Sequence, residues 1–174
     1  MPNAEEFKQR RSKYTVLLSG LFGVGKTLQA HSFPKCYTLS VDPDGLEVLR
    51  QPKNAKYLAN LVWFEELNAD GKGDLRALFD SEAKAEQRSS LYGCLRHAAQ
   101  LAKEGQVETL VLDGGTYLVG LLWDKINQLE EARSEKTGNI DRMAMYRSLG
   151  IQLQRLFASS IRAWCNKGPS VKTA

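Results

Sequence analysis

The stretch Gly20-Leu21-Phe22-Gly23-Val24-Gly25-Lys26-Thr27 decides how this chain is interpreted. It fits the pattern G-x-x-x-x-G-K-[ST] at every fixed position, which is the pattern of a phosphate-binding loop. Glycines allow such a loop to curl, because they adopt positive φ without a Cβ clash and let several backbone N–H groups face one phosphate. The sequence therefore predicts a site for the phosphates of a nucleotide. The alternative is an ordinary glycine-rich turn with a surface lysine.

The last residues of this P-loop have distinct expected roles. The Lys26 ammonium is expected to bind the β and γ phosphates, and the Thr27 hydroxyl is expected to bind Mg²⁺. The helix that follows adds the positive end of its dipole. The predicted cofactor-binding residues are Gly20, Phe22, Gly23, Val24, Gly25, Lys26, Thr27 and Leu28.

The segments on either side of the loop suit the motif. Tyr14 to Ser19 is β-branched, aromatic and apolar, which predicts a buried strand running into the loop. Residues 27–32 are predicted to be helical, and Phe33-Pro34 is expected to end that helix because the position before a proline disfavours helical geometry. Strand, glycine loop and helix are the context that the motif requires.

Carboxylates follow the next predicted strand, Cys36 to Val41. The chain continues as Asp42-Pro43-Asp44-Gly45, which places Asp42 and Asp44 at the carboxyl end of that strand. Ligands of open parallel sheets bind at this edge, so Asp44 is a candidate catalytic residue that orients an attacking water. Aspartate and proline also favour type I turns, and a plain turn is the alternative.

A second acidic strand end completes the expected site. Val107 to Asp113 is an apolar run that ends in an aspartate, which predicts a buried strand whose tip, Asp113, holds Mg²⁺ together with Thr27. Gly114 stands where many P-loop ATPases have a glutamate that polarises water. The general base is therefore expected elsewhere, with Asp44 the best-placed carboxylate.

The remaining chain is predicted to be mostly helical. His97 has no partner at metal-ligand spacing and is interpreted as a surface or half-buried side chain. Arg147, Arg155 and Arg162 lie off the apolar stripe of the last helix, where they face solvent or, as the alternative, phosphate. The predicted segments are an edge strand over 55–64, a helix over 81–103 capped by Gly105, a helix over 117–131, a polar loop over 130–139 and a helix over 140–164.

Composition indicates a cytoplasmic globular protein. The chain has 174 residues, 43% hydrophobic content and a formal net charge of +4, which permits a nucleic-acid partner. No run of 18 apolar residues predicts a membrane span, and the three cysteines are interpreted as reduced thiols rather than zinc ligands.

The expected organisation is a basic lead-in over 1–13, one domain over 14–165 and a tail over 166–174. No apolar strand follows the last predicted helix, so we expect either a small core or a fragment.

Several of these stretches together resemble a known family. The stretch from Leu17 to Thr27, the turn Ser40-Val41-Asp42-Pro43-Asp44-Gly45-Leu46, the strand end Thr109 to Asp113 and the stretch Met143 to Gly150 are similar to phage-encoded RecA-like P-loop proteins. The resemblance implies an α/β three-layer fold with a mostly parallel sheet, lacking its last core strand. It also implies that Asp44 takes the place of the water-activating acidic residue, more often a glutamate, and that residues 131–139 lie where the family has a DNA-contacting loop.

We therefore expect a protein that hydrolyses ATP with Mg²⁺ and acts on single-stranded DNA in recombination or annealing. It is expected to form a homo-oligomer in the cytoplasm of a phage host. ATP is favoured because the guanine-reading Asn/Thr-Lys-x-Asp pattern of GTPases is absent from the sequence. Two alternatives remain open at this point. One is a small-molecule or nucleotide kinase, and the other is a nucleotide-binding interaction module that does not hydrolyse.

Overall fold

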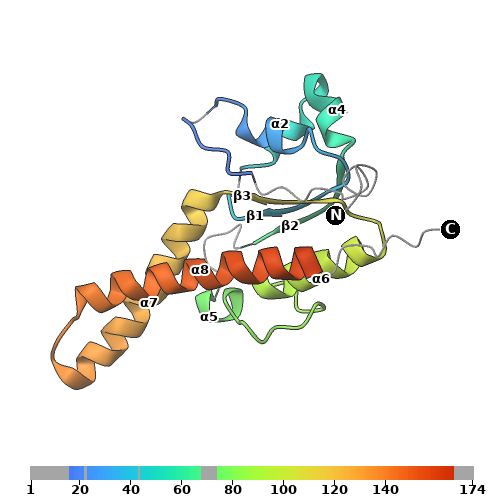
Figure 1. The fold of residues 1–174 in the computed structure, drawn as a ribbon. Helices are drawn as coiled ribbons and strands as arrows, with labels where there is room; N and C mark the ends of the chain where they lie inside the picture. Colours follow the sequence, from blue (N-terminus) through green and yellow to red (C-terminus); the bar gives the residue numbers. More distant parts are fainter. Residues whose placement is uncertain (1–15, 22, 43, 68–73, 167–174) are drawn as a thin grey trace, which may run out of the picture.

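The computed structural model describes residues 16–21, 23–42, 44–67 and 74–166 of the chain. Its centre is a parallel sheet with the strand order β2-β1-β3, formed by β1 (Cys36–Ser40), β2 (Leu61–Glu66) and β3 (Thr109–Asp113). Helices lie on both faces of this sheet (Figure 1). The fold is therefore α/β, as the sequence predicts, and the predicted lead-in over 1–13 and most of the tail over 166–174 lie outside the described residues.

The two helical layers differ in size. Figure 1 shows α2 and α4 on one face and α5, α6 and α8 on the other, with α7 and α8 forming a hairpin that extends beyond the sheet. The first group comprises α2 (Lys26–Ala30), α3 (Glu47–Arg50), the 3₁₀ turn η1 (Pro52–Asn54) and α4 (Ala55–Leu58). The second comprises α5 (Leu75–Leu78), α6 (Leu91–Lys103), α7 (Gly115–Thr137) and α8 (Arg142–Asn166). No helix in these described ranges is long and apolar enough to cross a membrane.

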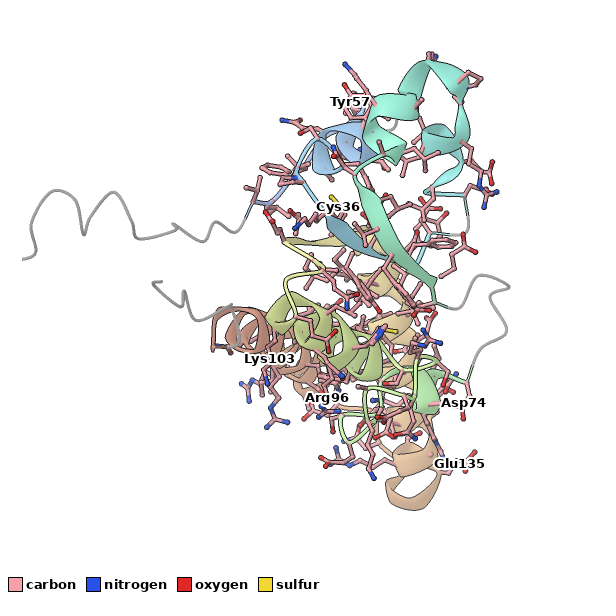
Figure 2. The ribbon with its side chains drawn as sticks, turned by 90° about the vertical axis from the view of Figure 1, so that its right-hand side faces the viewer. Cys36, Tyr57, Asp74, Arg96, Lys103 and Glu135 are labelled. Atoms are coloured by element: carbon pink, nitrogen blue, oxygen red, sulfur yellow. The ribbon has the colours of Figure 1, made fainter. Side chains whose placement is uncertain are left out.

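The central strand β1 presents chemically different faces to these layers. Tyr37 and Leu39 belong to the main hydrophobic core, which α6 and α7 complete with Leu91, Leu95, Leu118 and Leu122. Alternate residues of a strand point to opposite faces, and the other face of β1 consists of Cys36, Thr38 and Ser40. Figure 2 shows the sheet between the layer that carries Tyr57 and the α6 layer, which carries Arg96 and Lys103. The apolar core therefore lies on the α6 side, and the α2 side of β1 is small and polar.

Helix α6 is shorter than the predicted helix over 81–103, because it begins at Leu91. Its buried side chains include Cys94, Leu95 and Leu101, and Gly105 ends the helix with a φ of 74°. Residues 81–90, however, are turns. They are tied to their neighbours by polar contacts, because Ser90 Oγ donates to the Asp80 carbonyl at 3.1 Å and the Arg96 guanidinium donates to the Ser81 carbonyl at 2.7 Å. Side-chain bonds to the backbone here take the place of a helix.

The strand predicted to lead into the P-loop is not formed over its described part. Residues 16–19 form no strand, and Val16 and Leu17 are 57% and 88% exposed, while Tyr14 and Thr15 lie outside the described residues. A β-branched apolar run predicts a strand only where a neighbouring strand pairs with it, and within the described part of the chain residues 16–19 have no such partner. The predicted edge strand over 55–64 is shifted, because 55–58 form α4 and β2 begins at Leu61. Its position at the edge of the sheet is correct.

The predicted polar loop over 130–139 is mostly helical. Helix α7 continues to Thr137, and Gly138, with a φ of 68°, ends it. Glutamate, alanine, arginine and lysine favour helices even where no apolar residue is present, so polarity alone predicted the loop wrongly. The connection between the two long helices is therefore short, and Glu130 Oε1 accepts the Asp141 N–H at 3.2 Å across it.

Candidate functional site

The carboxyl ends of the parallel strands meet at one edge of the sheet. Ser40 at the end of β1 pairs with Asp113 at the end of β3, and the Val41 N–H donates to the Asp113 carbonyl at 3.2 Å. The chain leaves β1 toward the α2 face and leaves β3 toward the opposite face (Figure 1). Such a change of direction opens the crevice in which ligands of α/β proteins bind.

The two predicted metal ligands, Thr27 and Asp113, meet at this edge. The Thr27 hydroxyl donates to Asp113 Oδ2 at 2.8 Å, although these residues lie 86 positions apart in the sequence. The other carboxylate oxygen, Oδ1, accepts the Gly114 N–H at 2.9 Å. Both oxygens of Asp113 are therefore oriented, one by the P-loop helix and one by the start of α7.

Two glycines of the glycine-rich stretch over 20–27 have the positive φ that the sequence predicts. Gly23 and Gly25 have φ values of 79° and 86°, and a Cβ on either would meet no atom within 4 Å, so backbone conformation rather than space requires glycine there. The Lys26 ammonium donates to the carbonyls of Gly20 at 2.9 Å and Leu21 at 2.7 Å. The charged end of Lys26 is therefore held against the loop. Phe22, also predicted to bind the cofactor, lies outside the described residues.

Gly114 allows the two strand ends to approach each other. Its φ is 82°, and a Cβ there would stand 2.8 Å from the Asp42 nitrogen and 2.9 Å from Val41 Cγ2. The residue after Asp113 is thus packed directly against the segment that follows β1. This explains in physical terms why a glycine follows the acidic strand end.

Asp44, the candidate residue for orienting water, lies in an exposed turn after β1. Asp42 Oδ1 accepts the Asp44 N–H at 3.2 Å, and the Gly45 N–H donates to the Asp42 carbonyl at 3.1 Å, which makes the segment a turn. The Asp44 side chain is exposed, and among the described residues no hydrogen bond joins its carboxylate to Thr27 or Asp113. The role of Asp44 in orienting water therefore stays a prediction.

Sequence reasoning missed one buried group beside the site. His31, 0% exposed, contacts the Thr27 carbonyl through Nδ1 at 2.7 Å and Thr38 Oγ1 through Nε2 at 2.8 Å. The sequence contains only part of the information needed to predict these two contacts. His31 follows Thr27 by four residues, which is contact spacing on a helix, but nothing in the sequence pairs it with Thr38.

Two buried cysteines lie on opposite sides of the sheet, Cys36 on the α2 side and Cys94 in the apolar core. Burial raises the pKa of the Cys36 thiol to about 11 and that of the Cys94 thiol to about 12, which favours the protonated form of both at neutral pH. His97 is half-buried, as predicted, with Nδ1 at 3.1 Å from the Tyr37 hydroxyl and its ring against Trp63.

A hollow of about 330 Å³ in the α7–α8 hairpin, lined in part by Trp123 and Tyr146, lies apart from the P-loop.

The oxygens at the strand edge suit a magnesium ion. A hydroxyl and a carboxylate are hard ligands, and Mg²⁺ in nucleotide sites is held by one or two protein side chains, with phosphate and water completing its octahedron. Thr27 and Asp113 would supply these side chains. Among the described residues, no three His, Cys, Asp or Glu side chains gather as a protein-only metal site. With Thr27 and Asp113 as its protein ligands, a bound Mg²⁺ would need phosphate and water to complete its coordination.

Comparison of the chain with protein-family models, with curated proteins and with solved structures finds no match. The function of the chain is therefore inferred from the residues of the site and their contacts.

Proposed function

We propose that this chain is a Mg²⁺-dependent ATP-binding and ATP-hydrolysing P-loop protein of the RecA-like kind that acts on single-stranded DNA. The observation that carries the proposal is the 2.8 Å contact between Thr27 Oγ1 and Asp113 Oδ2. It joins the end of a full phosphate-binding motif to the acidic strand end that the motif needs as its partner.

In the proposed site, Lys26 binds phosphate, and Thr27 and Asp113 bind the metal. Lys26 exchanges the Gly20 and Leu21 carbonyls for phosphate oxygens when nucleotide binds, which places a positive charge on the triphosphate. Thr27 and Asp113 hold the magnesium ion, which when bound neutralises charge that develops on the phosphates. Asp44 orients the attacking water. Catalysis is then mostly positioning and electrostatic stabilisation.

Single-stranded DNA is the partner suggested by charge and by resemblance. The net charge of +4 favours a polyanion, and Arg147 and Arg155 are exposed on α8. Both arginines lie on α8, the helix that follows residues 131–139, where the RecA-like resemblance puts a DNA contact.

The test is ATPase activity with and without single-stranded DNA in the wild type and in Asp44→Asn. We expect turnover that DNA stimulates and that Asp44→Asn lowers by at least tenfold, because general-base assistance contributes about 10²–10⁴-fold to a rate. Binding of DNA should weaken as salt increases, since phosphate contacts release counterions. Phosphate transfer to a small acceptor without DNA stimulation would instead identify a kinase.

A second candidate follows from the exposed Asp44. Its side chain is exposed and its N–H is bonded to Asp42 Oδ1 in a turn, and a plain turn at this place would belong to a module that binds nucleotide without hydrolysing it. Nucleotide binding with no turnover, unchanged in Asp44→Asn, would support this second function over the first.

A further inference from the structure

Polar contacts join the P-loop helix to strand β1. None of the five residues of α2 is fully buried. The strand face beneath it consists of Cys36, Thr38 and Ser40, whereas the apolar residues of β1 point to the other side. Because α2 carries Thr27, the polar contacts that join α2 to β1 help to set the position of this residue.

His31 makes the shorter of these contacts, while Cys36 Sγ lies at 3.8 Å from the Ala30 carbonyl. Its ring lies between the Thr27 carbonyl, 2.7 Å from Nδ1, and Thr38 Oγ1 on β1, 2.8 Å from Nε2. A carbonyl only accepts hydrogen bonds, so Nδ1 carries the proton, and in the neutral ring Nε2 accepts from the Thr38 hydroxyl. The backbone on this side is tied as well, because Asn60 Nδ2 donates to the His31 carbonyl at 2.9 Å.

We infer that His31 and Thr38 form a buried pin that positions Thr27 for the magnesium ion. The inference rests on the proposed function and adds two positioning residues to it. The chain of contacts runs from β1 through Thr38 and His31 to the backbone of Thr27, whose hydroxyl meets Asp113 on β3. Two neighbouring strands thus hold one residue of the P-loop helix, from its backbone and from its side chain.

The pin is tested by comparing ATP affinity with Mg²⁺ and with EDTA. Thr38→Val keeps the shape of the side chain but leaves Nε2 without a donor in a site that excludes water. Residues that orient metal ligands typically contribute 10–100-fold to metal affinity. We expect Thr38→Val and His31→Gln to lower the Mg²⁺-dependent gain in affinity by about tenfold, with the affinity in EDTA changed by less than about threefold.

The matched controls separate positioning from folding. Thr38→Ser retains the hydroxyl and should retain the Mg²⁺-dependent gain, as should Ser32→Ala, which alters an exposed side chain just beyond the same helix. Equal losses of affinity with and without Mg²⁺, together with a lower melting temperature, would show a merely structural role and overturn the inference. Failure of Thr38→Ser to rescue would overturn it as well.

A second measurement needs no nucleotide. The chain has two histidines, so long-range ¹H–¹⁵N spectra of the ligand-free protein report both rings, and His31→Gln identifies the signal of His31 by its loss. We expect the Nδ1–H tautomer for His31 and a change of its ring shifts in Thr38→Val. The Nε2–H tautomer would overturn the pin even if ATP binds. If the wild type binds no ATP, the proposed function fails and the tautomer alone decides about the pin.

Discussion

Lys26→Ala is expected to weaken ATP binding by about 100-fold while leaving the fold intact. Hydrogen bonds to charged groups contribute roughly 1.5–3 kcal/mol each, and about 1.4 kcal/mol corresponds to tenfold in affinity. The Lys26 ammonium donates to the carbonyls of Gly20 and Leu21 at the exposed loop, so its removal takes nothing from the apolar core. Titration calorimetry of wild type and variant with Mg²⁺ and ATP provides the measurement.

Lys103→Ala is the matched control for this variant. It removes the same charge from an exposed position at the end of α6, far along the chain from the loop, so ATP affinity should stay within about twofold of the wild type. Equal losses of affinity in the two variants would reduce the role of Lys26 to its contribution to net charge.

Gly114→Ala is expected to lower the free energy of unfolding by about 2–5 kcal/mol. The left-handed conformation costs a residue with a Cβ roughly 1–2 kcal/mol, and overpacking typically costs 1–3 kcal/mol more. Both apply, because φ is 82° and the added Cβ would stand 2.8 Å from the Asp42 nitrogen. That atom belongs to the backbone and moves only with the end of β1. Urea unfolding monitored by circular dichroism measures the change.

The neighbouring glycine provides the control. Gly115 begins α7, has no positive φ, and a Cβ there would meet no atom within 4 Å. Gly115→Ala should therefore be neutral or stabilise the protein by up to about 1 kcal/mol, because alanine is the better helix former. Similar destabilisation by both substitutions would mean that the close approach of Gly114 to Asp42 is not what requires glycine.

The sequence predicted best where a single pattern settles the local structure. β1 and β3 follow from short apolar runs with polar or acidic ends, and Gly105 ends α6 as predicted from its position after the apolar stripe. The encounter of Thr27 with Asp113 was predicted from the order of the two motifs, because a P-loop helix and an acidic strand end share one edge of a parallel sheet.

Predictions failed where the outcome depends on a partner distant in sequence. Residues 16–19 have strand composition but no paired neighbour among the described residues, and residues 81–90 have helical composition but are held as turns by Ser90 and Arg96. The contact of His31 with Thr38 depends on how α2 crosses β1, which no spacing in the sequence encodes. Local propensity is decisive only until tertiary contacts compete with it.

Thr27 and Asp113 are proposed to hold magnesium together with a bound nucleotide. The most direct test is calorimetric titration of ATP, with and without Mg²⁺, into the wild type and into Asp113→Asn. This substitution keeps the size of the side chain and removes its charge. We predict that Mg²⁺ strengthens ATP binding by at least about tenfold in the wild type and that this gain disappears in Asp113→Asn. An absence of ATP binding at millimolar concentrations, or an equal Mg²⁺ effect in both proteins, would contradict the account.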